Sequence, residues 1–122
     1  MNTPWGQSQV IEKIAEGIDF VSTAGHGGMK LSADNNAKVP LSWREASFKQ
    51  QGLQGWYEED CDVAMVMITF PMCFSENNVA RAKEAMQHCY PQCDLSLVKP
   101  SLPFTKEQQE TMVDKLNKAI KS

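Results

Sequence analysis

The predicted fold rests on residues 8–32, which read SQVIEKIAEGIDFVSTAGHGGMKLS. Apolar and polar residues alternate imperfectly along this stretch, and glycines interrupt it at Gly17 and again within residues 25–28. Alternation is typical of half-buried strands, and glycines are typical of the turns that join them. We therefore predict a three-stranded antiparallel sheet, built as a meander, over residues 8–32.

Helical signals follow the predicted sheet. Ser32 begins a run of short polar residues that favours a capped helical turn before Pro40, and residues 42–51 are expected to form a short helix. The most apolar stretch, residues 61–70, fits a buried strand or a buried helix. Its helix-favouring composition and the acidic residues 58–60 just upstream favour the helix, with the acidic residues as its charged start.

The remaining chain is also predicted to be mostly helical. Ser75 is placed to cap a helix that continues to about His88, and residues 95–98 are expected in an extended crossing or an edge strand. Thr105 opens a capping box before a final amphipathic helix. Because strands come first and helices later, we predict an α+β fold in which a small three-stranded antiparallel sheet is covered by three or four helices.

Length and charge exclude several functional classes. The 122 residues suit a single domain, which we assign to residues 1–122. Twelve basic and 15 acidic residues give a net charge of −3, so we expect no direct binding of nucleic acid. No apolar run approaches the ~20 residues that span a bilayer, and the first residues lack the pattern of a signal peptide. We expect a cytoplasmic protein without membrane contact.

The four cysteines are Cys61, Cys73, Cys89 and Cys93. In a reducing cytosol, free and partly buried thiols are the favoured interpretation. Disulfides and a zinc site that includes His88 are the alternatives, and the lack of a CxxC pair weighs against zinc. We expect no metal ion and no cofactor.

Two segments carry the candidate site. His26 lies among glycines, which permit close approach of a ligand and leave the imidazole reachable. Residues 56–60, WYEED, contain two aromatic residues followed by three acidic residues. The three carboxylates repel one another, so they are expected where water, a cation or a basic partner screens their charge. An ordinary hairpin turn and a charged helix start are the structural alternatives. The candidate binding surface consists of His26, Gly27, Gly28, Trp56, Tyr57, Glu58, Glu59 and Asp60.

Short motifs in the first part of the chain resemble a known family. They are TPWG at 3–6, STAxHGG at 22–28, GWYEEDC at 55–61 and FP at 70–71. In this order they resemble a domain of unknown function found in proteins of phages, plasmids and other mobile elements of bacteria. The resemblance covers about residues 3–71 and leaves residues 72–122 as a helical C-terminal part. It implies a mobile-element setting and a packed pair of Trp5 and Trp56 that fixes the sheet against the acidic helix. The family has no assigned catalytic residues, so the resemblance transfers none to this chain.

We predict a small non-enzymatic binding protein of a phage or mobile element, acting in the cytoplasm of a bacterial host. It is expected to inhibit a host defence protein or nuclease by covering a basic surface with residues 56–60 and the His26 turn. The alternative is a small hydrolase or nucleotide-processing enzyme that uses His26 and a carboxylate of residues 58–60, which requires both segments in one cleft. A structural or DNA-metabolism accessory domain is a third interpretation.

Overall fold

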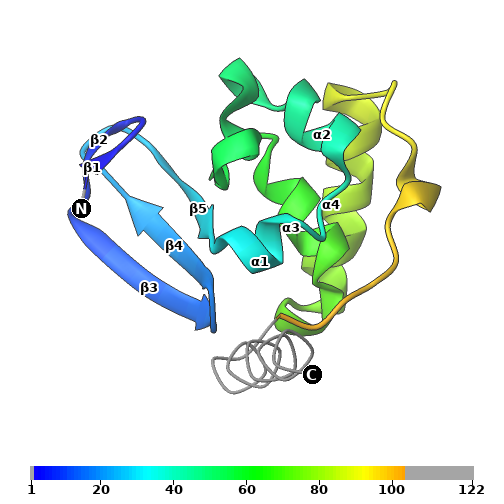
Figure 1. Ribbon diagram of the computed structural model, residues 1–122, viewed down its shortest axis with the longest axis horizontal. Helices are drawn as coiled ribbons and strands as arrows, with labels where there is room; N and C mark the ends of the chain where they lie inside the picture. The colour runs from blue at the N-terminus through cyan, green and yellow to red at the C-terminus, as the bar shows by residue number, and fades with distance from the viewer. Residues whose placement is uncertain (1, 104–122) are drawn as a thin grey trace, which may run out of the picture.

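The computed structural model describes residues 2–103, in which a sheet lies to one side and helices pack to the other (Figure 1). The main sheet is antiparallel, with strands in the order β3 (Val10–Ala15), β4 (Ile18–Ser22), β5 (Gly27–Leu31) and β6 (Trp56–Glu58). A small hairpin of β1 (Asn2–Thr3) and β2 (Gly6–Gln7) precedes it. The α-helices are α1 (Ala33–Asn36), α2 (Leu41–Ala46), α3 (Val63–Thr69) and α4 (Glu76–Cys89). The predicted α+β class is confirmed.

The predicted meander is present as β3, β4 and β5, but the prediction of three strands is wrong because β6 adds a fourth. β6 pairs antiparallel with β5 and places Tyr57 opposite Met29. Gly55 guides the chain into this position. It adopts a positive φ of 86°, and its carbonyl accepts a hydrogen bond from the Leu31 amide at 2.9 Å. Residues 56–58 are therefore a strand and not the start of a helix.

The helix predicted within residues 61–70 is confirmed as α3, whose residues are largely buried. The predicted caps are also confirmed. Ser32 Oγ accepts a hydrogen bond from the Asn35 amide at 3.3 Å, and Ser75 Oγ accepts one from the Asn78 amide at 3.1 Å. These hydroxyls satisfy amides that the first turn of a helix leaves without partners.

Other predicted boundaries need correction. The helix expected over residues 42–51 ends earlier, since α2 stops at Ala46 and a 3₁₀ segment, η1 (Phe48–Gln54), follows it. Residues 95–97 form a 3₁₀ turn, η3 (Leu95–Leu97), in place of an edge strand, because the Asp94 carboxylate accepts a hydrogen bond from the Ser96 amide at 2.9 Å. Another 3₁₀ turn, η2 (Pro71–Cys73), joins α3 to α4. The helix predicted after Thr105 lies outside the described residues.

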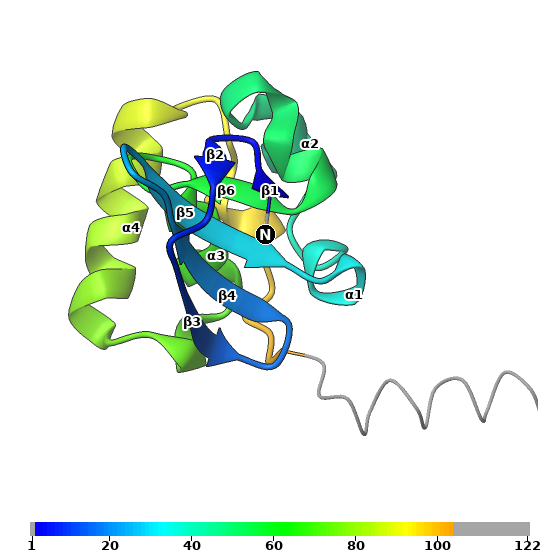
Figure 2. The ribbon, with the colours of Figure 1, turned by 90° about the vertical axis from the view of Figure 1, so that its left-hand side faces the viewer.

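The core lies between the sheet and the helices behind it (Figure 2). Its fully buried large side chains come from both layers: Ile18, Leu31 and Tyr57 from the sheet, Trp43 from α2, Met65 from α3, Phe70 after α3 and Met86 from α4. Burial of such side chains contributes about 1.5–3 kcal/mol each. The sheet is therefore fixed against the helices, which in turn fixes the position of its loops.

A disulfide joins the segment before α3 to the end of α4. Cys61 precedes α3, Cys89 is the last residue of α4, and their Cα atoms lie 6.3 Å apart. The prediction of free thiols is wrong for this pair, because the packing of α3 on α4 brings the two side chains together. Cys73 and Cys93 are free and half-buried, in agreement with that prediction.

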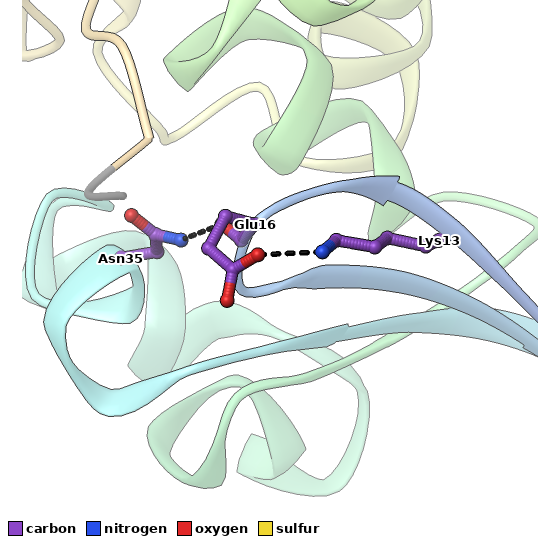
Figure 3. Close-up of polar contacts among 3 residues, drawn as sticks. All are labelled: Lys13, Glu16 and Asn35. Atoms are coloured by element: carbon purple, nitrogen blue, oxygen red, sulfur yellow. Dashed lines mark hydrogen bonds and ion pairs between the residues drawn. The ribbon is translucent and has the colours of Figure 1, made fainter. Parts of the chain in front are cut away.

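Polar contacts fasten α1 to the turn between β3 and β4 (Figure 3). Asn35 Nδ2 donates a hydrogen bond to the Glu16 carbonyl at 3.0 Å, and Lys13 Nζ lies 2.5 Å from the Glu16 carboxylate (Figure 3). Gly17 allows this approach, since a Cβ there would lie 2.5 Å from Asn35 Nδ2. The exposed ion pair contributes little, so the buried amide of Asn35 is the contact that holds this turn.

Candidate functional site

An aromatic pair packs against the paired strands β5 and β6. The rings of Trp5 and Trp56 pack edge to face, with centroids 5.6 Å apart and an interplanar angle of 86°. Gly28 lies against the Trp5 ring, because a Cβ on Gly28 would come within 3.0 Å of both this ring and the Tyr57 carbonyl. The packed pair of Trp5 and Trp56 is confirmed. Close packing explains the glycine at position 28.

The turn between β4 and β5 exposes His26. The Thr23 amide donates a hydrogen bond to the His26 carbonyl at 2.7 Å, and Thr23 Oγ1 accepts one from the His26 amide at 3.1 Å. The next residue, Gly27, faces the acidic segment. Its carbonyl accepts a hydrogen bond from the Glu59 amide at 2.9 Å, and a Cβ on Gly27 would lie 2.7 Å from Glu59 Oε2. Strand pairing therefore places residues 58–60 beside the His26 turn.

These two segments border one pocket with a volume of about 520 Å³. Small-molecule sites commonly occupy ~300–1,000 Å³, so the pocket has room for a ligand or a large side chain. The pocket is lined by Pro4, Trp5, His26, Phe48, Lys49, Gln51, Glu58 and Asp60. We call it the His26–Glu58 pocket.

Not every residue of the candidate surface is accessible. Tyr57 is fully buried on the other side of β6, where its hydroxyl donates a hydrogen bond to Asn36 Oδ1. Gly27 and Gly28 are buried as well. The structure thus leaves His26, Trp56, Glu58, Glu59 and Asp60 as the members of the candidate surface that reach solvent.

The segment η1 supplies part of the pocket wall, namely Phe48, Lys49 and Gln51. No sequence motif indicated that these residues belong to the site. Lys49 and Gln50 adopt positive φ angles of 51° and 55°, which side-chain-bearing residues seldom adopt. Such backbone strain costs of order 1–3 kcal/mol per residue and is often found at functional sites. It places Lys49 on the pocket wall, with Nζ 5.3 Å from the centroid of the Phe48 ring.

A buried carboxylate holds this strained wall in place. Asp62 is fully buried, accepts a hydrogen bond from the Phe48 amide at 2.9 Å and accepts another from the Tyr90 hydroxyl. Burial raises the pKa of Asp62, while the hydrogen bonds from Tyr90 and from the backbone at Phe48 and Glu58 lower it in part. Asp62 therefore positions the pocket wall without lining the pocket.

The carboxyl groups inside the pocket are crowded. Burial raises the pKa of Glu58, and its hydrogen bond with Asp60 and the charges of Asp60 and Asp62 raise it further, whereas His26 lowers it. A group whose ionised form is disfavoured by desolvation and like charge is stabilised by an incoming cation. The pocket is thus suited to a positively charged ligand group.

The raised pKa of Glu58 predicts a cost in stability. The folded protein holds this proton more tightly than the unfolded chain, so the contribution of Glu58 to stability falls as the pH rises above about 4.3 and through the raised folded pKa. Glu58→Gln cannot ionise and is expected to unfold at a higher temperature than the wild type at pH 7, with the advantage fading toward pH 4. Thermal unfolding across this range measures it, with exposed Glu45→Gln as control. Parallel pH profiles of Glu58→Gln and wild type would contradict the prediction.

Two features are absent from residues 2–103. No group of three or more His, Cys, Asp and Glu side chains in this part of the chain is arranged to hold a metal ion. Across the same residues, no helix has the length and apolar character needed to cross a membrane.

The fold and the pocket define a small α+β protein with an open, acidic and aromatic pocket at one end of its sheet. The chain belongs to the DUF7007 family, a domain of unknown function whose family model matches residues 1–117. The predicted membership of a family of unknown function is confirmed, and the match continues past residue 71, where the resemblance in the sequence ended. Neither a curated protein nor a solved structure matches the chain.

Proposed function

We propose that this protein is a small binding protein of a phage or other mobile element. It occupies a basic surface of a host protein, such as a defence protein or a nuclease, and thereby inhibits it. The observation that carries the proposal is the meeting of the His26 turn and the carboxylates of Glu58 and Asp60 around one open pocket. The resemblance to mobile-element proteins and the small size of the chain support the setting.

The charge of the surface supports a basic partner. Glu59 and Asp60 are exposed, Glu58 is half-buried, and both Glu58 and Asp60 line the pocket. Complementary charge speeds the encounter of two proteins and disfavours wrong partners, while buried aromatic anchors supply much of the affinity. Trp5 and Phe48 line the same pocket and are the aromatic anchors of this surface.

Reversing the charge of this surface tests the proposal. The triple variant Glu58→Lys, Glu59→Lys and Asp60→Lys is expected to bind the partner at least about tenfold more weakly, and with less dependence on salt. Partner capture from bacterial lysate, followed by titration of the purified partner at low and high salt, gives both quantities. The matched control reverses three exposed carboxylates elsewhere, Glu12, Glu45 and Glu84, and carries the same net charge. Equal binding by the two triple variants would exclude the proposed surface.

A small hydrolase or nucleotide-processing enzyme is the second candidate function. It is favoured by one observation, that His26 and the carboxyl groups of Glu58 and Asp60 line the same pocket. An imidazole next to a carboxyl group of raised pKa is a suitable pair for general acid–base catalysis. Turnover of nucleotides or model esters that is lost in both His26→Gln and Glu58→Gln would favour the enzyme over the binding protein.

A further inference from the structure

We propose that the His26–Glu58 pocket receives an arginine side chain of the partner protein. The guanidinium group lies against the carboxyl groups of Glu58 and Asp60, with Trp5 and Phe48 as aromatic walls. This inference rests on the proposed binding function and specifies the chemistry of its central contact.

The paired carboxyl groups favour a guanidinium over an ammonium group. Glu58 and Asp60 are two residues apart and both line the pocket, so their carboxyl groups border the same space. A guanidinium group is planar and presents five donors in a fixed fork, which lets it bind more than one carboxylate oxygen at once. The ammonium group of lysine is a compact, strongly hydrated point charge and gains less from this arrangement.

The aromatic wall of the pocket already holds a cation of the protein's own. Lys49 Nζ lies 5.3 Å from the centroid of the Phe48 ring, within the ~6 Å range of a cation–π contact. Guanidinium groups form such contacts readily and also stack on aromatic faces. The partner's arginine takes the position that Lys49 holds in the free protein, and Lys49 is therefore its internal competitor.

Two buried polar atoms among the lining residues favour an arginine within a peptide over a free cation. Trp5 Nε1 and Gln51 Oε1 are buried and have no hydrogen-bond partner among the described residues. Gln51 Oε1 needs a donor, which a guanidinium supplies, and Trp5 Nε1 needs an acceptor, which a peptide carbonyl supplies. An arginine residue in a polypeptide carries both groups.

A nucleotide is the main competing ligand, because aromatic walls also stack bases. Its phosphate would have to lie near the carboxyl groups of Glu58 and Asp60, where like charges repel. Among the described residues that line the pocket, Lys49 and His26 are the basic ones that could oppose this repulsion. The balance of charge in the pocket therefore favours the arginine.

The direct test uses the intact chain and defined small probes. N-acetyl-arginine methylamide is titrated into the protein, and the indole N–H signal of Trp5 is followed by NMR. We expect millimolar binding that shifts this signal, and at least about tenfold weaker binding of the matching lysine compound and of adenosine monophosphate. Glu58→Gln and Asp60→Asn should each weaken binding of the arginine compound about tenfold. Glu45→Gln, on the exposed face of α2, should not.

A change at Lys49 tests the competition. Lys49→Gly removes the internal cation and suits the positive φ at this position, so it should tighten binding of the arginine compound about twofold or more. Stronger binding of adenosine monophosphate, or undiminished binding in Glu58→Gln and Asp60→Asn, would overturn the inference. If the arginine compound does not bind, but the triple charge reversal still abolishes partner capture, the arginine contact is excluded and the proposed binding function is retained. If the arginine compound does not bind and the triple charge reversal also leaves partner capture unchanged, both the arginine contact and the proposed binding surface are excluded.

Discussion

Gly28→Ala is expected to lower the free energy of unfolding by about 3 kcal/mol, one of the two largest effects that we predict. The added methyl group would come within 3.0 Å of the Tyr57 carbonyl and of the Trp5 ring. The carbonyl belongs to the backbone of β6, so the clash cannot be relieved by a side-chain rotation. The strand pairing of β5 with β6 must yield, and with it the position of the pocket wall.

Gly25→Ala is the matched control for this experiment. Gly25 lies three residues earlier, in the turn before β5, and apart from its chain neighbours no residue has an atom within 4 Å of a Cβ built there. Gly25→Ala is expected to change the free energy of unfolding by less than about 1 kcal/mol. The alanine restricts the unfolded chain, and this loss of entropy determines whether the change is stabilising or destabilising. Urea unfolding monitored by tryptophan fluorescence compares the two variants. Similar midpoints for both would show that Trp5 and β6 do not pack on Gly28 as described.

Reduction of the disulfide between Cys61 and Cys89 is expected to lower the free energy of unfolding by about 3–4 kcal/mol. The bond closes a loop with a sequence separation of 28 residues, and this closure restricts the unfolded chain. Cys61→Ser together with Cys89→Ser should reproduce the loss in the absence of reductant. Thermal unfolding with and without dithiothreitol measures both effects.

The free cysteines provide the control for the disulfide. Cys73→Ser and Cys93→Ser leave the bond intact, so the double variant should keep the wild-type response to reductant. Since both thiols are half-buried, this variant is expected to lose only about 1 kcal/mol of stability. An unchanged melting temperature of the wild type on full reduction would contradict the predicted contribution of the bond.

Local patterns were sufficient to predict much of the fold. The meander followed from alternation and glycine turns, and the starts of α1 and α4 followed from the caps at Ser32 and Ser75. In each case neighbouring residues determine the structure. β6 is different, because it has three residues and its stability comes from pairing with β5, a partner distant in the sequence. Acidic residues 58–60 resemble the charged start of a helix, so the prediction assigned them to the following helix and missed the strand.

The candidate site was predictable in part. Exposed His26 and the acidic segment were recognised from residue type, and pairing of β5 with β6 brings them to one pocket. The contribution of η1 was not predictable, because nothing in the residues Lys49 and Gln50 signals a left-handed backbone. The disulfide was not predictable either, since it depends on how α3 lies along α4 and not on the spacing of the cysteines.

The hydrogen bonds of Asp62 have a consequence for affinity. This one carboxylate holds the Phe48 amide beside the pocket and the Tyr90 hydroxyl just beyond α4. The pocket wall at Phe48 and the segment at Tyr90 are therefore already fixed in the free protein, before a ligand binds. A preorganised receptor loses less conformational entropy on association, so even a single inserted side chain can be retained by few contacts.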